Sequence, residues 1–334
     1  MSQCQLLRFR WGRNATASKS SLFLPPEAIS HYLRTTRLQN LMITRIAILL
    51  VVAAFVLPTM AAEKVKILII DGQNHHNWSG TTPVLKGILE KTGRFDVSVS
   101  TTPGAKSPKE AWAGWRPAFK EYGAVLMNYL GEEWPQGVKT AFVDYIRNGG
   151  GLIIFHAANN SFPAWREYNE MIGVGGWEGR DEKSGPKLYW QDGKIVRDTS
   201  PGPGGHHGEA HEYVVEIRLS QHLIVKDLPP KWLHSVDELY DSLRGPAQNI
   251  GVIATAYSAP EKGGTGRHEP MLMAIGYGRG RVFHDAMGHD VPSLQDTGFQ
   301  VTFARGCEWA ATGKVTIPAP TPKEMPADRV GLAK

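Results

Sequence analysis

The sequence predicts an α/β fold in which helices flank a mainly parallel sheet. Short, uniformly apolar runs, which are typical of buried strands, alternate along the chain with longer segments whose apolar residues recur at helical spacing. The composition agrees, because 42% hydrophobic and 21% charged residues are usual for a globular protein with a packed core. This alternation extends over residues 64–313 without an internal repeat, and we therefore expect one domain there.

An apolar run and a proline mark the first strand and the first helix of this domain. Residues 66–70 form a buried-strand run that ends at Asp71. Thr82 is expected to cap the next helix, because Pro83 then takes the first helical position, where its missing N–H costs nothing. Gly93 is the expected end of this helix.

Three further strands and two helices complete the first half of the domain. Strands are predicted at 95–100, 124–127 and 152–155, and the last of them ends at His156. The order Ser-Pro-Lys-Glu over 107–110 has the spacing of a capping box, which opens a helix between the first two of these strands. The second helix is marked by an apolar face that comprises Val138, Phe142, Tyr145 and Ile146.

The second half of the domain is less regular. Glycines and prolines gather over residues 162–230, which predicts a loop-rich insertion. Strand-like runs return at 213–217, 251–257, 271–275 and 282–283. The last helix carries Phe299, Phe303, Cys307 and Ala310 on one face, so Cys307 is expected to pack in the core rather than act as a nucleophile. Four prolines between positions 318 and 326 indicate a disordered tail over 314–334.

The N-terminal residues are predicted to be a leader rather than part of the folded domain. After Met42, a basic residue and an apolar run over 46–57 are followed by a small-x-small cleavage pattern, which is typical of a secretory signal peptide over 42–61. A membrane anchor is the alternative, but the run is shorter than the roughly 20 apolar residues that cross a bilayer. Residues 1–41 are expected to be a mis-annotated extension or a disordered leader, with a transit peptide as another alternative. We expect export to the periplasm or the exterior, with no stable membrane span after cleavage.

The charge of the chain argues against nucleic acid as a partner. The net charge of +5 comes from the N-terminal residues, because the chain from Ala62 onward has 30 Lys and Arg against 31 Asp and Glu. A protein that binds nucleic acid needs a basic surface to neutralise phosphates. The two cysteines are too few for a disulfide framework, and they form no closely spaced pair for a thiolate zinc site.

Polar residues follow several of the predicted strands, where ligands bind in open parallel sheets. The candidates for contact with a substrate are Asp71, Asn74, His76, Trp78, Asn159, Tyr240 and Asp290. Exposed indoles stack on sugar rings, and Trp177 and Trp190 are further candidates for such contacts because they lie in predicted loops.

The candidate catalytic groups are His156 and His289, which follow predicted strands, and Glu238, which the family resemblance described below favours. An imidazole at the end of a strand can act as a base, polarise a carbonyl or bind a metal. A carboxylate beside Asp237 in a partly closed site is expected to have a raised pKa, which suits proton transfer at neutral pH. The alternatives are structural: His156 can fix its turn by a hydrogen bond, and Glu238 can be a solvated or salt-bridged surface residue. Asp290 is also expected to cap the turn beside His289.

The densest polar cluster lies at residues 206–212. Imidazoles and carboxylates are good ligands for a divalent metal such as zinc, and the candidate metal ligands here are His206, His207, Glu209 and His211. The spacing matches no zincin motif, however, and the cluster lies within the glycine-rich insertion. A flexible loop with exposed histidines explains the cluster equally well.

Four of these motifs, in the same order, resemble the ThuA-like family, which is named for trehalose utilisation. They are Asp71-Gly72-Gln73-Asn74 with His76 and Trp78, the glycine triplet 149–151 that leads to His156, the tetrad Asp237-Glu238-Leu239-Tyr240, and Gly278-Arg279-Gly280-Arg281-Val282 that leads to Gly288-His289-Asp290. The resemblance implies a class I glutamine amidotransferase-like fold, which is a flavodoxin-like three-layer sandwich. It also implies a role in carbohydrate catabolism, alongside oxidoreductases that make keto-sugars.

The residues and the resemblance together predict an exported enzyme, a hydrolase, lyase or isomerase, that acts on a sugar or keto-glycoside by acid–base chemistry, with metal assistance left open. Glutamine amidotransferases have a nucleophilic cysteine at the turn where this sequence has His156, so amide hydrolysis through a thioester is excluded. No nucleotide cofactor is expected, because the glycine triplet precedes a strand rather than a helix. The alternatives are a non-catalytic carbohydrate-binding module and a module that docks a sugar oxidoreductase.

Overall fold

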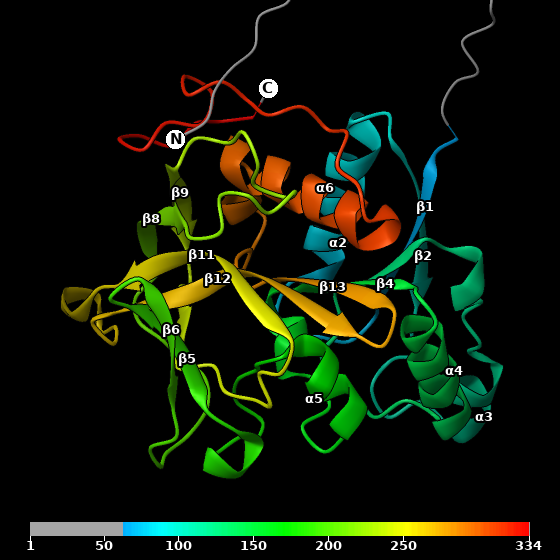
Figure 1. Cartoon of the computed structure of the whole chain (residues 1–334). Coiled ribbons are helices and arrows are strands. Elements are labelled where there is room, and N and C mark those ends of the chain that lie inside the picture. The colour runs from blue at the N-terminus through cyan, green and yellow to red at the C-terminus, as the bar shows by residue number, and fades with distance from the viewer. Residues whose placement is uncertain (1–62, 334) are drawn as a thin grey trace, which may run out of the picture. The chain divides into compact units, whose positions relative to one another are not determined.

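One large sheet of eleven strands organises the residues that this computed structural model describes, 63–333 (Figure 1). Its main path consists of β1 (Val65–Asp71), β2 (Phe95–Thr101), β3 (Ala124–Met127), β4 (Gly151–Phe155), β8 (His211–Ile217), β9 (Lys231–Asp237), β11 (Ile250–Ser258), β12 (Arg267–Tyr277) and β13 (Gly280–Asp285). The order across the sheet is β2-β1-β3-β4-β13-β12-β11-β8-β9. A separate antiparallel pair joins β7 (His206–His207) to β10 (Tyr240–Asp241).

Helices cover both faces of the half of the sheet in which β2, β1, β3, β4 and β13 pair in parallel. The helices are α2 (Trp78–Lys91), α3 (Lys109–Gly114), α4 (Gln136–Arg147), α5 (Arg166–Ile172) and α6 (Thr297–Thr312). Figure 1 shows α2 and α6 on one side of the sheet and α3, α4 and α5 on the other. β3 and β4 are buried along their whole length, because a hydrophobic core lies on each face. The predicted three-layer α/β sandwich is therefore confirmed.

The other half of the sheet is antiparallel and extends into the predicted insertion. β12, β11, β8 and β9 pair antiparallel with their neighbours. The hairpin of β5 (Lys187–Gln191) and β6 (Lys194–Asp198) attaches to β12. β5, β6 and β9 are not predicted from the sequence, because their partly exposed side chains form no continuous apolar run. The segment predicted as loops, 162–230, therefore contains the hairpin of β5 and β6.

The first helix begins about one turn earlier than predicted. The side chain of Asn77, rather than Thr82, caps α2 by accepting a hydrogen bond from the N–H of Gly80. Pro83 consequently lies inside the helix. The predicted capping box over 107–110 does not form either, since the first turn of α3 has no side-chain cap. Both helices exist as predicted, but each starts differently.

The proline-rich tail is ordered, which corrects the prediction of disorder. Within residues 314–333, the carbonyl oxygen of Pro326 accepts a hydrogen bond from the N–H of Leu233 in β9 at 2.9 Å. Met325 is 1% exposed and packs in one of the two cores. The prolines restrict the backbone of the tail without preventing it from packing on the domain.

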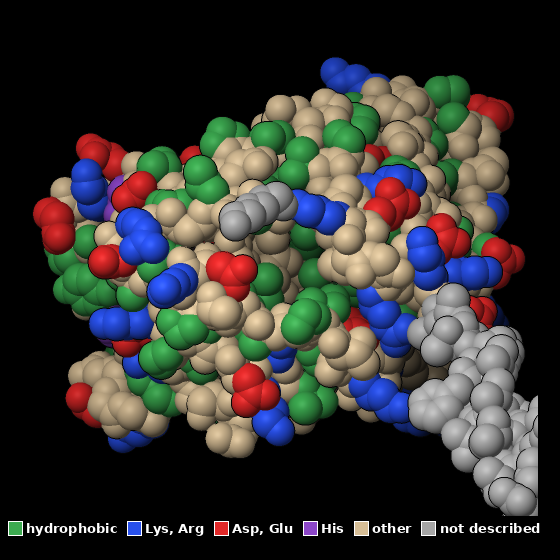
Figure 2. Space-filling view, turned by 90° about the horizontal axis from the view of Figure 1, so that it is seen from above, with side chains coloured by type: hydrophobic (Ala, Val, Ile, Leu, Met, Phe, Trp, Pro, Cys, Tyr) green, Lys and Arg blue, Asp and Glu red, His purple; other side chains and the backbone are tan. Residues whose placement is uncertain are grey.

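The predicted leader and signal peptide lie outside the described residues. Within residues 63–333, no helix is both long enough and apolar enough to cross a bilayer. Figure 2 shows basic and acidic side chains interspersed on the face seen from above. That mixture agrees with the nearly balanced charge of the chain from Ala62 onward.

Candidate functional site

Loops from both halves of the sheet bring three histidines and one glutamate together. His76 and His156 follow β1 and β4, and His289 follows β13. The ring centroid of His76 lies 5.1 Å from that of His156 and 4.8 Å from that of His289. Glu238, which follows β9, lies 3.4 Å from Nε2 of His289. The three candidate catalytic residues and His76 therefore share one neighbourhood.

His156 has a fixed tautomer and an unused ring nitrogen. Its Nδ1 lies 2.9 Å from the carbonyl oxygen of Ala286, and because a carbonyl only accepts, Nδ1 carries the proton. Nε2 then has a lone pair, and this atom is buried without a hydrogen-bond partner. Burial lowers the pKa of His156 to about 3, so the ring is neutral at physiological pH. The bond to Ala286 fixes the turn, as the structural alternative predicts, but it leaves Nε2 available to a ligand.

The backbone at His156 also departs from the usual conformations. Its φ is 42°, in the left-handed region that strains a residue with a side chain. This strain occurs where β4 passes directly into a short helical turn over His156–Asn160. The turn directs the imidazole of His156 toward the rings of His76 and Tyr240, whose centroids lie 5.1 and 4.0 Å away.

His76 presents its second ring nitrogen to the same space. The amide oxygen of Asn74 lies 3.1 Å from Nδ1 of His76, so Nδ1 carries the proton. Nε2 lies 3.3 Å from the hydroxyl of Tyr240. Burial and the neighbouring His289 lower the pKa of His76 to about 4. Asn74 and Tyr240, both predicted site residues, thus orient His76.

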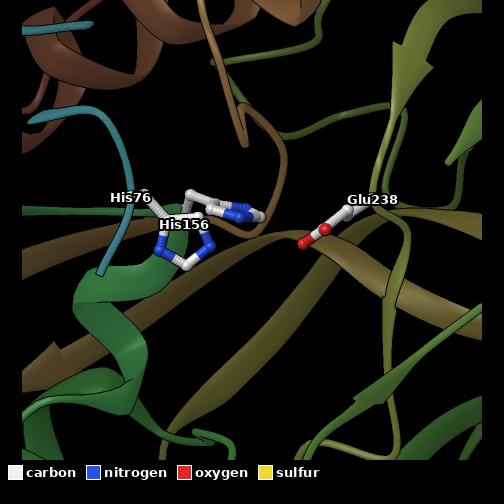
Figure 3. A group of neighbouring side chains, drawn as sticks. All are labelled: His76, His156 and Glu238. Atoms are coloured by element: carbon white, nitrogen blue, oxygen red, sulfur yellow. The ribbon is translucent and has the colours of Figure 1, made fainter. Parts of the chain in front are cut away.

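Glu238 faces the two imidazoles from the opposite side (Figure 3). Its side chain is 19% exposed, and its carboxylate also lies 3.7 Å from Nε2 of His207. One nitrogen each of His76 and His156 and one oxygen of Glu238 all lie within 4.8 Å of one another. Two neutral imidazoles and a carboxylate are a donor set that binds divalent zinc. Within residues 63–333, this is the one group of three such side chains that meets this spacing.

Asp237 holds the backbone of the two loops that carry Glu238 and His289. Its Oδ1 accepts hydrogen bonds from the N–H groups of both residues at 2.9 Å, and its Oδ2 accepts one from Gly288 at 2.7 Å. Gly288 has a φ of +104°, and a Cβ there would lie 2.4 Å from the ring of Phe155, so only glycine allows this approach. The Asp237 carboxylate faces these N–H groups rather than Glu238. Asp237 thus acts as a turn cap.

A second buried residue, His234, extends this network to α6. Its Nε2 lies 2.9 Å from Asp237, and its Nδ1 lies 2.7 Å from Asp296. Burial alone would lower its pKa, but the two carboxylates raise the pKa of His234 to about 10, so the ring is charged at neutral pH. Asp296 in turn accepts the N–H of Phe299 and caps α6. His234 is not predicted from the sequence, because it lies in a strand that has no clear pattern.

Three candidate substrate-binding residues have structural contacts, and two of them, Asp71 and Asn159, lie inside the protein. Asp71 is 2% exposed and accepts a hydrogen bond from the hydroxyl of Thr101 at 2.7 Å. Asn159 is fully buried, and its side-chain amide lies 3.0 Å from Nε2 of His284. Asp290 caps the short helical turn that follows it, as expected for that residue. The structure therefore places these three side chains in loop-stabilising contacts.

The dense histidine cluster is not assembled into the metal site that its composition allows. Nδ1 of His206 lies 3.0 Å from the carboxylate of Asp241, whereas Nδ1 of His211 lies 2.7 Å from the backbone carbonyl of Glu209. The Glu209 carboxylate forms an exposed ion pair instead. His207 alone faces the candidate site. The reason is that successive side chains of an extended strand such as β7 point in opposite directions.

A cleft with two compartments opens beside the candidate site. The inner compartment, of about 220 Å³, is lined by His76, Asn160, Trp177, His207, Glu238 and Tyr240. The outer compartment, of about 560 Å³, is lined by Gln73, Asn74, Trp78, Ala105, Gly131 and Glu132, with Gly72 beside them. Three further residues, His75, Leu130 and Glu178, line both compartments.

Two of the three candidate sugar-stacking tryptophans lie in this cleft. Trp78 lines the outer compartment and Trp177 the inner one, where its ring centroid lies 4.6 Å from that of Tyr240. Trp190 lies in β5 rather than in a loop, and it lines a different groove. The guanidinium of Arg218 lies 5.6 Å from the centroid of the Trp190 ring. Trp190 is therefore no part of this cleft.

Some residues of the cleft are not identified from the sequence. Asn160 lines the inner compartment although its neighbour Asn159 is the predicted residue, because the helical turn after β4 exposes the second asparagine. Glu132 follows β3, and the strand-end rule could have identified it. Glu178 lies in the irregular segment and carries no sequence signal.

Comparisons with known proteins agree with this architecture. The model of the ThuA family, described as trehalose utilisation, matches residues 66–310. The chain is similar to a ThuA-like protein of Parabacteroides merdae, with 46% identity over 81% of this chain and 98% of that one and a TM-score of 0.77. A ThuA-like protein of Bacteroides uniformis shares 19% identity over 78% of this chain and 96% of that one, with a TM-score of 0.51, which supports the fold alone. The comparison with curated proteins found no match.

Proposed function

Since the chain belongs to the ThuA family, we propose that it is an enzyme that acts on a sugar or an oxidised glycoside with the help of a divalent metal ion. Membership of this family implies a role in carbohydrate metabolism. The reaction and the metal are our inference from the geometry of the candidate site. Two observations carry it: Nε2 of His156 is buried and unpartnered, and one ring nitrogen each of His76 and His156 lies within 4.8 Å of a carboxylate oxygen of Glu238.

His76, His156 and Glu238 are the residues that would hold the metal. Their donor atoms come from three separate loops and include two imidazole nitrogens whose protons are fixed on the other ring nitrogen. Three protein ligands leave a coordination position open, as in catalytic zinc sites. When bound, such a cation would supply Lewis-acid polarisation of a substrate carbonyl.

His289 is the group placed to move a proton. Its side chain is 34% exposed, and its backbone is fixed by Asp237 beside the inner compartment. We assign its imidazole to take a proton from the carbon next to a carbonyl, while the C–H electron pair forms a carbon–carbon double bond and the carbonyl π pair moves onto oxygen. Delivery of the proton to the other face or to another atom of this enolate completes an isomerisation. In an elimination, the oxygen pair re-forms the carbonyl, and the group on the next carbon leaves with its bonding electron pair and takes the proton from the imidazolium.

Two features support a sugar as the substrate. Trp177 and Tyr240 offer aromatic faces inside the inner compartment, and Asn160 offers an amide for hydroxyl groups. Amide hydrolysis is not proposed, because His156 stands at the turn where glutamine amidotransferases have their cysteine. Cys307, the cysteine within the described residues, is buried in α6 as predicted.

A keto-glycoside must be made before it can be consumed, so we propose a sugar oxidoreductase as the enzyme that supplies the substrate.

Export to the periplasm or exterior is also proposed, on the pattern of residues 42–61 alone. Sequencing the N-terminus of the protein isolated from its host tests this: a start near Ala62 supports export, and a start at Met1 in the cytoplasm contradicts it.

Turnover of keto-glycosides before and after chelation tests the proposed enzyme. We expect the zinc- or manganese-loaded protein to convert the substrate, a chelator to stop conversion, and added metal to restore it. The Glu238→Gln variant keeps the size of the side chain but loses its charge, and it should require more metal for half-maximal activity. Sugar binding without any turnover would instead favour the carbohydrate-binding alternative, which the tryptophans of the cleft would serve.

A further inference from the structure

We propose that the outer compartment is a binding subsite for a second, uncharged unit of the substrate. The substrate is then a neutral glycoside of at least two units, with the reacting sugar in the inner compartment and the second sugar or aglycone against Trp78. The position of the reacting end rests on the proposed function. The evidence for the subsite itself is the size, lining and charge of the outer compartment.

The cleft is large and continuous enough to hold two units. The outer compartment, at about 560 Å³, is more than twice as large as the inner one, at about 220 Å³. His75, Leu130 and Glu178 line both, so a ligand can extend from one into the other. Ligand sites bury most of the surface of their ligand, and a single sugar in the inner compartment would leave the larger space to water.

Hydrogen bonds hold the walls of the outer compartment together. The side chain of Gln73 is mostly buried, donates a hydrogen bond to the carbonyl of Pro103 at 2.8 Å and accepts one from the N–H of Glu132 at 3.0 Å. A Cβ at Gly131 would lie only 2.4 Å from Oε1 of Gln73, so the loop can approach this closely only because residue 131 is glycine. Three loops are thus held in place before a ligand arrives, which lowers the ordering cost of binding.

The lining of the outer compartment combines an aromatic side chain with amides. Trp78 begins α2 and is half-buried, so part of its indole faces the compartment. Asn74 and Gln73 lie in the same lining as amides. An aromatic face beside hydrogen-bonding groups suits a sugar ring, which has apolar C–H faces and hydroxyl edges.

The charge of the outer compartment favours an uncharged second unit. Glu132 and Glu178 are the charged residues among those that line the outer compartment, and neither Lys nor Arg lines it. Glu132 is held in position, since its carboxylate accepts a hydrogen bond from the N–H of Lys106 at 3.0 Å. A phosphate or carboxylate group on the second unit would be repelled by these carboxylates.

Calorimetric titration of the metal-loaded protein with glucose, trehalose and trehalose 6-phosphate tests this proposal. We expect trehalose to bind about tenfold more tightly than glucose, the effect of roughly one added stacking contact. Trp78→Ala should remove this advantage and leave the affinity for glucose unchanged. Trp190→Ala is the matched control, because it deletes an indole outside the cleft, and it should change neither affinity.

The charged ligand tests the selection against anions. Trehalose 6-phosphate should bind more weakly than trehalose to the wild type. The double variant Glu132→Gln, Glu178→Gln should reduce this difference in affinity. Equal binding of the two disaccharides by the wild type would overturn the selection by charge. Equal binding of glucose and trehalose, or no effect of Trp78→Ala on trehalose, would overturn the subsite.

Turnover measured alongside separates this proposal from the proposed function. A preference for trehalose that depends on Trp78, without turnover of any keto-glycoside, would support the subsite and contradict the enzyme. Equal kcat/KM for the keto forms of glucose and trehalose would support the enzyme and contradict the subsite. The absence of both binding and turnover would contradict both.

Discussion

Two groups of histidines in this protein differ in where their side chains lie. The histidines of one group are close in sequence but contact different partners, and those of the other are distant in sequence but close in space. His206, His207 and His211 lie within six positions, yet their ring nitrogens contact different partners. His76 and His289 lie far apart in the chain, yet their ring centroids are 4.8 Å apart. The ends of strands therefore predict where imidazoles meet in this protein better than a dense run of histidines does.

The sheet explains the difference. β4 and β13 pair in parallel with Asp285 opposite Phe155, so the residues that follow the two strands emerge side by side. Parallel pairing thus directs distant loops into one space. β7, by contrast, is a short extended segment, and extended backbone separates successive side chains. Variants in both groups of histidines test this contrast.

His156→Ala should have the largest effect. The variant removes the buried Nε2 that we assign to the metal, and we expect kcat/KM for a keto-glycoside to fall by roughly a thousandfold or more. Circular dichroism should show an unchanged fold, since alanine fits the space of an imidazole without a clash. Activity within a few-fold of the wild type would contradict the role of His156.

Asp237→Asn should have an intermediate effect. The change weakens the hydrogen bonds that residue 237 accepts from the N–H groups of Glu238 and His289. We expect kcat to fall by about 10- to 100-fold while the metal is retained. Tyr213→Phe is the control, because it removes a hydrogen bond to the same carboxylate without touching the two loops. If both variants lose the same activity, Asp237 does not act through these loops.

The buried His234 should make stability depend on alkaline pH. Its pKa is about 10 in the folded protein against 6.5 in the unfolded chain, so its ion pairs stabilise the fold fully below pH 6.5. This contribution is lost as the pH rises to about 10, with a slope of up to about 1.4 kcal/mol per pH unit. Urea unfolding of the wild type and of His234→Gln at several pH values checks it. Parallel curves for the two proteins would contradict the prediction.

His206→Ala and His211→Ala should have the smallest effects. Both side chains are partly or largely exposed and lie outside the proposed ligand set. We expect changes in the free energy of unfolding of about 0.5 kcal/mol or less and unchanged kcat/KM. A loss of activity comparable with that of His156→Ala would restore the metal site first considered for this cluster.

The predictable part of the fold follows from the way its strands are buried. β1, β3 and β4 are continuous apolar runs because helices cover both faces, and their ends correctly locate His76 and His156. β5, β6 and β9 are only partly buried, so no comparable run exists in the sequence. The predicted start of the first helix differs for a local reason, since the side chain of Asn77, rather than that of Thr82, caps α2.

The candidate site is only partly predictable for a related reason. His156 and His289 follow from strand ends, whereas Glu238 follows an unpredicted strand, and only the resemblance to a known family identifies it. His234 acts through burial between two carboxylates, which no sequence pattern reveals. The helical turn after β4 decides whether Asn159 or Asn160 faces the cleft, and a sequence pattern cannot resolve a difference of one residue.

Cobalt titration of the metal-free protein is the sharpest test of the proposed metal site, because bound Co²⁺ has a visible spectrum that reports its coordination. We expect about one tightly bound ion per chain in the wild type and in His211→Ala, weaker binding in Glu238→Gln, and loss of this binding in His156→Ala. Equal binding by the wild type and His156→Ala, or loss of binding in His211→Ala alone, would contradict it.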